Sequence, residues 1–419
     1  MTYDFPRLAR KITFVLFLTQ SLASAGFIAM AVLNPILGAQ LGGSAIWTGV
    51  PTAVYLLAGA FAASLWGIFM ERSGRRNGIA LGMVIGVLGA TLVVLAVDAH
   101  TLPLFLVGMM CMGIANSAAQ LGRFAAAEVN LAERRGAAIS NVVIGGTVGA
   151  VFGPLLVQPM GDFVATHGMD QLAGAYFAAA ILFSFATLAV FIGLRPDPRD
   201  IGRALVDKFP DVTQIRRRVD GSARPLAEIL RQPAVRIAII SMVAGQVVMV
   251  AIMVITSLHM KEHQHTLGNI STVISAHTIG MFAFSIISGR LADRFGRGPV
   301  ILFGASTLLI ACLTAPLSPD VFPLAVSLFL LGLGWNFCFV GGSTLLADQL
   351  SPAERARTQG TSDMLVGLAS AAASLGSGFI FAASNYTVIS LVAASLSIIP
   401  IVLVIVWMRK PVAVITSTR

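Results

Sequence analysis

Twelve blocks of about twenty apolar residues divide this chain, and they constrain its fold more than any other feature. A helix of that length crosses the hydrocarbon core of a bilayer, which is roughly 30 Å thick. Only 11% of the residues are charged, whereas soluble domains carry about 25%. The sequence therefore predicts an all-α membrane protein with twelve transmembrane helices. The blocks lie near residues 12–36, 47–69, 78–97, 102–122, 137–160, 172–194, 235–258, 268–288, 299–317, 322–346, 358–383 and 386–408.

The distribution of basic residues predicts how the chain is oriented. Every Lys and Arg except Lys261 falls in a segment that is cytoplasmic if the chain starts inside the cell. Cytoplasmic loops of helical membrane proteins are enriched in these residues. The bias predicts that both termini are cytoplasmic, and it explains the net charge of +9 without a nucleic-acid partner. The first block is too long for the core of a signal peptide, so we expect it to be a retained span.

A polar segment interrupts the apolar pattern in the middle of the chain. It contains several prolines and three consecutive arginines at 216–218, and it is too poor in apolar residues to form a core. We interpret it as a cytoplasmic linker that lies along the anionic face of the bilayer. The predicted division is an N-terminal six-helix half over 1–194, the linker over 195–234, and a C-terminal six-helix half over 235–419.

A motif rich in glycine and charged residues occurs once in each half. It follows the second and the eighth apolar block, so we infer that a six-helix unit has been duplicated. Its glycines permit a tight turn, and its acid and arginines can pair with neighbouring helix ends. We interpret the two copies as gating latches, not as ligands for cargo. Their residues are Gly67, Glu71, Arg72, Gly74 and Arg75, and then Gly289, Asp293, Arg294, Gly296 and Arg297.

This duplicated motif resembles the signature of the major facilitator superfamily, and the resemblance covers the whole chain. It implies a major facilitator fold, in which two six-helix halves surround a central site, and transport by alternating access. Gly149 to Pro154 in the fifth block also resembles the G-x-x-x-G-P motif of proton-coupled exporters in that superfamily. Small residues let helices approach closely and a proline bends them, so we expect close packing and a bend there.

Sulfur and imidazole side chains gather in the seventh and eighth blocks. Met249 and Met253 share one face of a helix, as do His277 and Met281, because each pair is four residues apart. At 1.5 Å per residue, Met249 and His277 both lie about 15 Å below the external loop. Thioether and imidazole groups are ligands that Cu(I) accepts. The pattern predicts a copper site, although methionines at this spacing also serve in packing and a buried histidine can simply bond a carbonyl.

The external loop above these helices offers a second group of metal ligands. We expect it either to collect metal at the external mouth or to be an ordinary solvated loop. The residues concerned are His259, Met260, His263 and His265. The cysteines at 111, 312 and 338 fall in different blocks and provide no disulfide framework and no closely spaced thiolate site.

The two spaced pairs are similar to the motifs of the CcoA-like copper importers, a bacterial branch of the same superfamily. That resemblance implies that Met249, Met253, His277 and Met281 bind copper as cargo and not as a cofactor. It further implies a multi-pass protein of the bacterial inner membrane that supplies cytoplasmic copper for cytochrome oxidase, with copper chaperones as partners. We expect a monomer.

The rival hypothesis is a proton-coupled transporter of small organic molecules, either an exporter of drugs or metabolites or a riboflavin-type uptake system. It rests on amide and indole side chains in the apolar blocks that could line an organic pocket. These are Gln20, Asn116, Gln120, Gln246, Trp335 and Asn336. Asp363 is the only carboxylate that we place inside a helix, near its cytoplasmic end, and Arg123 likewise lies at a cytoplasmic helix end. The sequence contains no nucleotide-binding loop and no nucleophile paired with a base, so we predict a protein that is not an enzyme.

Overall fold

A computed structural model describes residues 4–131, 134–208 and 224–409. The described part is helical and contains twelve helical segments long and apolar enough to cross a membrane, which confirms the predicted fold class. The three arginines at 216–218 lie outside the described residues. The spans comprise α1 (Phe5–Gly42), α2 (Val50–Ser73), α3 (Arg75–Asp98), α4 (Leu102–Gln120) with α5 (Gly122–Glu128), α6 (Arg135–Phe152) with α7 (Val157–Ala165), α8 (Gly174–Gly193), α12 (Pro233–Glu262), α13 (Leu267–Phe282) with α14 (Ser285–Phe295), α15 (Arg297–Thr314), α16 (Val321–Asp348), α17 (Pro352–Ala383) and α18 (Tyr386–Met408).

Short helices connect several of these spans. They are η1 (Ala45–Gly49), η3 (Pro154–Leu156), η4 (Gln171–Ala173), α9 (Pro198–Lys208), α11 (Leu226–Arg231) and η5 (Ala315–Leu317). The predicted linker between the halves contains two of these helices, α9 and α11. α9 forms because Ile201 and Leu205 lie one turn apart and are both buried, while Arg203 on another face is exposed.

The first span is longer at both ends than its apolar block. α1 begins at Phe5, directly after Asp4, whose carboxylate accepts a hydrogen bond from the backbone N–H of Arg7 (3.2 Å). It ends at Gly43, which adopts the left-handed conformation (φ 70°) that terminates helices. Hydropathy missed these turns because capping, and not apolarity, defines the ends of a helix.

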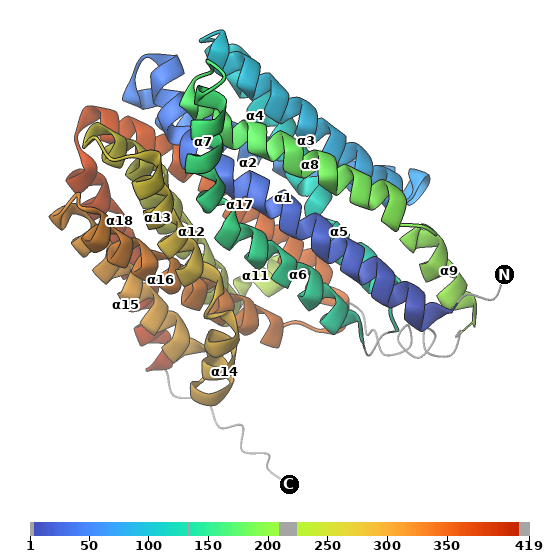
Figure 1. The fold of residues 1–419 in the computed structure, drawn as a ribbon. Coiled ribbons are helices and arrows are strands. Elements are labelled where there is room, and N and C mark those ends of the chain that lie inside the picture. Colours follow the sequence, from blue (N-terminus) through green and yellow to red (C-terminus); the bar gives the residue numbers. More distant parts are fainter. Residues whose placement is uncertain (1–3, 132–133, 209–223, 410–419) are drawn as a thin grey trace.

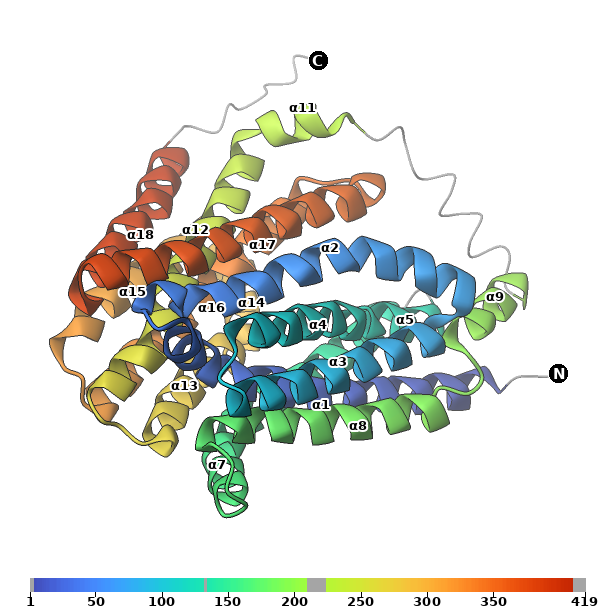
Figure 2. The same ribbon diagram turned by 90° about the horizontal axis from the view of Figure 1, so that it is seen from above.

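Helices α1–α8 gather on one side of the molecule and α12–α18 on the other (Figures 1 and 2). We call the end at which α1 begins and α18 ends the termini end, and the opposite end, where α1 leads into η1, the loop end. Among the described residues, two hydrogen bonds join the groups, and both lie at the loop end. Ser374 Oγ donates to the carbonyl of Gly49 (2.8 Å), and the N–H of Gly268 donates to Gln158 Oε1 (2.8 Å).

The fifth span is interrupted where the sequence predicted a bend. α6 stops at Phe152, and a short 3₁₀ turn beginning at Pro154 leads into α7. On the α1-facing side of α6, a Cβ added at Gly149 would lie 2.2 Å from the carbonyl oxygen of Ser21. Only glycine permits so close a backbone approach, so both the close packing and the bend expected here are confirmed.

Candidate functional site

A cavity of about 410 Å³ lies between the two groups of helices. Side chains of α1, α2, α4, α5, α6, α12 and α13 line it, so both halves of the chain contribute. Because the two hydrogen bonds between the halves lie at the loop end, the cavity is closed there and open toward the termini end. The lining is mostly apolar, with amide and hydroxyl groups spaced along it.

The four Met and His residues predicted as copper ligands all line this one cavity. α12 carries Met249 and Met253 one turn apart, so both reach the cavity from the same helix face. α13 carries His277 and Met281 in the same way, and Met281 lies in the last turn before the helix breaks. The structure therefore brings these four residues to one lining, as a shared metal site would require.

His277 is held in a defined orientation by the neighbouring helix α16. The side chain is 1% exposed, and its Nδ1 lies 2.9 Å from the carbonyl oxygen of Leu328. A carbonyl only accepts hydrogen bonds, so Nδ1 carries the proton. In the neutral ring Nε2 then carries a lone pair, and this atom is buried with no hydrogen-bond partner. A histidine oriented through one nitrogen, with the other left as a free acceptor, is the arrangement found in metal ligands, and it equally suits a solute N–H or O–H.

Two glycines make this orientation possible. A Cβ added at Gly332 of α16 would lie 2.2 Å from the carbonyl oxygen of His277, and one at Gly280 of α13 would lie 2.3 Å from that of Phe329. The two helix backbones therefore touch, and this contact brings the carbonyl of Leu328 within reach of the imidazole. The sequence does not show this relation, because the partners are far apart along the chain.

Four of the six residues proposed for an organic pocket also line the cavity. The Gln20 amide donates to Ser24 Oγ (3.2 Å), and Gln246 Oε1 accepts from the indole N–H of Trp335 (2.6 Å). The side chains of Asn116 and Gln120, on α4, make no hydrogen bond within the described part of the chain. Their amides are therefore available to a solute in the cavity.

The other two predicted pocket residues are not part of the lining, and this corrects the sequence interpretation. Asn336 is 2% exposed and donates its amide N–H groups to the carbonyl of Met281 (2.6 Å) and to Ser285 Oγ (2.8 Å). Its role is to join α16 to the break between α13 and α14. The Trp335 indole N–H donates to Gln246 Oε1 and so orients that amide. A polar residue within an apolar block can serve helix packing as well as substrate binding.

Sequence reasoning missed the aromatic residues of the cavity, and it placed Arg123 at a helix end and not in the cavity. Phe27, Tyr55 and Phe282 line it, and the Phe27 and Tyr55 rings lie 6.1 Å apart. Arg123 also lines the cavity, with its Nε buried and unpartnered, and Asp363 of α17 is within its electrostatic reach. Helical spacing could have revealed Phe27 as a lining residue, because it lies seven residues, or two turns, after Gln20 and so on the same helix face.

The structure does not bring all four of the predicted external metal ligands together. Met260 is fully buried in the core, because the helix continues to Glu262 and turns this side chain inward. The His259 ring stacks on Tyr386 at 4.3 Å, and His265 Nε2 donates to the carbonyl of Pro319 (2.9 Å). His263 is exposed beside His259. Within the described residues, no group of three or more His, Cys, Asp and Glu side chains could hold a metal ion.

The first gating motif forms a tight turn between α2 and α3. Gly74 has φ 95°, a conformation that side chains other than glycine disfavour. Arg75 Nε lies 3.0 Å from both carboxylate oxygens of Glu128 at the end of α5. Asp197 accepts from the backbone N–H groups of Arg75 (3.1 Å) and Arg76 (3.0 Å), and so caps α3.

The second motif repeats this arrangement between α14 and α15. Gly296 has φ 91°, and Arg297 Nε donates to Asp348 at the end of α16 (2.9 Å). Arg297 also pairs with Asp293 within the motif (2.9 Å). The partners Glu128 and Asp348 lie at corresponding places in the two halves, which the sequence motif alone does not reveal. Each pair joins two residues of the same half, so neither pair bridges the halves in this conformation.

The remaining motif residues lie in helices. Gly67 and Gly289 have no atom within 4 Å of an added Cβ, while Glu71, Arg72 and Arg294 lie in the last turns of α2 and α14.

Comparison with protein families places the whole of this architecture in a known group. A family model for the Major Facilitator Superfamily matches residues 16–265 and 237–418. "Uncharacterized MFS-type transporter YdeG" of Bacillus subtilis is 34% identical over 404 residues, which cover 96% of this chain and 93% of that protein. "Riboflavin transporter RfnT" of Brucella anthropi is 28% identical over 382 residues, 91% of this chain and 92% of that protein.

Solved structures share the fold at low sequence identity. The nucleoside transporter NupG superposes with a TM-score of 0.67 at 15% identity, covering 96% of this chain and 100% of that one. The xylose transporter XylE from E. coli, in a partially occluded inward-open conformation, gives 0.68 at 16% identity, covering 97% and 98%. These similarities extend over nearly all of each chain.

Proposed function

The chain belongs to the Major Facilitator Superfamily, and from this premise we propose that it transports a small organic solute of the riboflavin type. The observation that carries the proposal is the cavity lining, where aromatic rings and amides without internal partners surround a space of about 410 Å³. A flat heteroaromatic ring with polar edges would stack on the aromatic side chains and hydrogen-bond the amides. The similarity to the riboflavin transporter RfnT supports the same solute class.

The charge of the cavity agrees with such a solute. Arg123, with its buried and unpartnered Nε, favours a neutral or anionic group at the termini end of the cavity. We further propose that the termini end faces the cytoplasm of a bacterial inner membrane, as the distribution of Lys and Arg predicts. In that orientation the conformation described here is open to the inside. The halves, 1–194 and 235–419, would rock about the cavity with 195–234 as their linker.

Copper import is the second candidate, and one observation favours it. Met249, Met253, His277 and Met281 line the same cavity, and His277 presents a partnerless Nε2. These are ligands that Cu(I) accepts, as in the CcoA-like branch that the sequence resembles. Copper would then be the cargo, passed from the outside to cytoplasmic chaperones.

One uptake experiment with two matched variants separates these candidates. In Asn116→Leu/Gln120→Leu, each amide is replaced by an apolar group of similar size, so we expect riboflavin transport to fall about tenfold or more while copper accumulation is unchanged. In Met249→Leu/Met281→Leu, the sulfur ligands are lost at nearly constant volume, so riboflavin transport should persist.

Both assays would use cells that lack their own riboflavin and copper uptake, with membrane abundance measured in parallel. Gln40→Leu is the control, because Gln40 is exposed outside the cavity. The riboflavin-type proposal is overturned if the amide variant transports riboflavin at the rate of the unmodified protein. Loss of copper accumulation only in the methionine variant would establish the second candidate in its place.

A further inference from the structure

A second hollow, unrelated to the transport cavity, lies between the termini ends of α1 and α6. It has a volume of about 640 Å³ and is lined by residues of both helices and of the segment between α5 and α6. A smaller hollow of about 310 Å³ shares Ala9, Arg10, Asn130 and Arg134 with it and continues toward α9. Together we call the two hollows the α1–α6 groove.

The α1–α6 groove lies on the outer surface of the molecule. On α6, the groove is lined by Asn141 and Ile144, whereas the transport cavity is lined by Val142, Val143 and Gly146. These two sets lie on opposite sides of a helix with 3.6 residues per turn. Phe14 (64% exposed) and Ile144 (49% exposed) confirm that the groove faces outward, where hydrocarbon surrounds a membrane-spanning helix.

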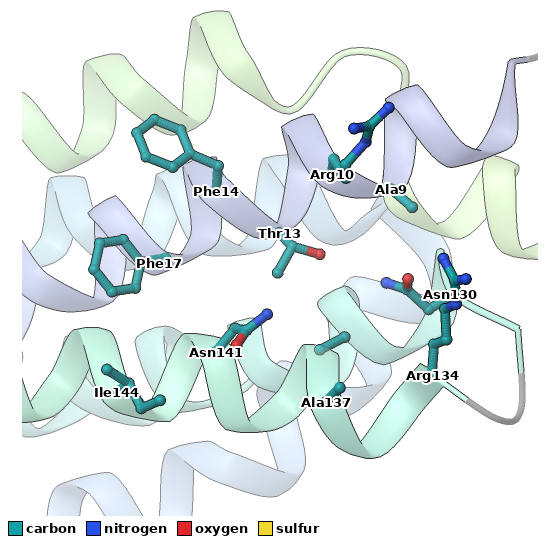
Figure 3. A pocket seen from close by; sticks show the side chains of 11 residues that line it. Ala9, Arg10, Thr13, Phe14, Phe17, Asn130, Arg134, Ala137, Asn141 and Ile144 are labelled. Carbon is teal, nitrogen blue, oxygen red and sulfur yellow. The ribbon is translucent and has the colours of Figure 1, made fainter.

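Polar and apolar side chains are separated along the groove (Figure 3). Arg10, Asn130 and Arg134 lie toward one end, which is the termini end, and Phe14, Phe17 and Ile144 lie toward the other. Thr13 and Asn141 lie between them and face one another across the groove. A charged end beside an apolar end is the order in which a phospholipid presents its headgroup and its acyl chains.

The charge of the groove selects an anionic headgroup. Within the described part of the protein, the side chains of Arg10 and Arg134 make no ion pair or hydrogen bond with another side chain, and the described lining includes no Asp or Glu. The amphipathic helix α9 contributes Leu205 to the smaller hollow and carries Arg203 on an exposed position nearby. Basic pockets between membrane helices and basic amphipathic helices both bind anionic lipids.

We propose that the α1–α6 groove binds one anionic diacyl phospholipid, with its phosphate at Arg10 and Arg134 and an acyl chain along Phe14, Phe17 and Ile144. Phosphate accepts charge-assisted hydrogen bonds from arginine, and amide and hydroxyl groups can complete the headgroup site. The lipid would also contact both α1 and α6. This proposal is independent of the cargo.

The test measures lipid binding to the purified full-length protein by native mass spectrometry, with phosphatidylglycerol and phosphatidylethanolamine as probes. We expect phosphatidylglycerol to bind more tightly than phosphatidylethanolamine, and Arg10→Gln/Arg134→Gln to weaken phosphatidylglycerol by about tenfold or more, because each arginine near an anionic surface contributes severalfold. Arg231→Gln/Arg409→Gln is the matched control, since it removes two exposed charges outside the groove. Equal binding by the groove variant and this control would overturn the proposal.

Two further arms identify the source of the phosphate and guard against misfolding. Phe14→Ser alters an exposed side chain only, and we expect it to weaken phosphatidylglycerol while the melting temperature in detergent stays unchanged. Glycerol 3-phosphate should not displace the lipid at equal concentration. Displacement by glycerol 3-phosphate, or unchanged lipid binding by Phe14→Ser, would show that the groove holds a soluble phosphate compound or no lipid, and the proposal would fail.

Discussion

At the scale of single residues, two glycines determine how the gating motifs turn. Gly74 (φ 95°, ψ 158°) and Gly296 (φ 91°, ψ 163°) adopt a backbone region that is essentially restricted to glycine. Each ends one helix and starts the next, which brings Arg75 and Arg297 to acidic partners on neighbouring spans. The motif therefore needs glycine for backbone geometry, whatever its role in gating.

We predict that Gly296→Ala destabilises the protein by about 1–3 kcal/mol. The space around the position is open, since the nearest atom to an added Cβ is Pro299 Cδ at 3.9 Å, so the effect isolates backbone strain from steric clash. The measurement is the thermal unfolding of purified protein in detergent. The control is Gly289→Ala, in the same motif but helical and with no atom within 4 Å, which should be neutral or slightly stabilising. Equal effects of the two substitutions would contradict the argument.

At the scale of elements, the start of α17 is fixed by a buried carboxylate. Glu354 is 2% exposed and completes a capping box with Ser351, while Arg224 donates to both of its carboxylate oxygens (2.8 and 2.9 Å). The Arg224 side chain, followed by backbone N–H groups, holds the pKa of Glu354 well below its ordinary value of 4.5. This ion pair attaches the segment that begins at Arg224 to the C-terminal half.

We predict that Glu354→Gln lowers the melting temperature by several degrees at neutral pH. Because the folded-state pKa is depressed, the ionised carboxylate stabilises the fold fully above about pH 4.5 and progressively less as the pH falls below that value. The difference between the variant and the unmodified protein should therefore shrink on acidification. Asp98→Asn is the control, because Asp98 is exposed and forms no ion pair among the described residues. A difference that stays constant from pH 7 to pH 3.5 would refute the assignment.

At the scale of the whole molecule, the contact at the loop end determines which side of the cavity is open. Gly49 of η1 packs directly on α17, where a Cβ would lie 1.6 Å from the carbonyl oxygen of Ser374. The hydrogen bond between Ser374 and Gly49 joins the halves at this point. A transporter that alternates between two states must break this contact to open its loop end.

We predict that Gly49→Ala separates the halves at the loop end and shifts the population toward the state open there. The added methyl group cannot be accommodated against a backbone carbonyl without movement of η1 or α17. Distances between spin labels on the loop-end segments of the two halves should lengthen. Gly376→Ala, two residues from Ser374 on the same helix and with no atom within 4 Å of its Cβ, should leave the distances unchanged. An unaltered distance distribution in Gly49→Ala would refute this role for the contact.

The sequence by itself determined the class of fold, because apolar length sets the number of spans and the duplicated turn motif indicates two related halves. It also identified the four Met and His residues through their helical spacing, and four of the cavity amides because they are polar side chains within apolar blocks. Only the tertiary structure decided which polar residues face the cavity. Asn336 and Met260 look like ligands in the sequence, yet neighbouring helices bury them, and Arg123 enters the cavity from a helix end. The sequence also could not show the orientation of His277 or the α1–α6 groove, because both depend on how neighbouring helices pack. The close approach of α13 to α16 depends on the glycines at their contact.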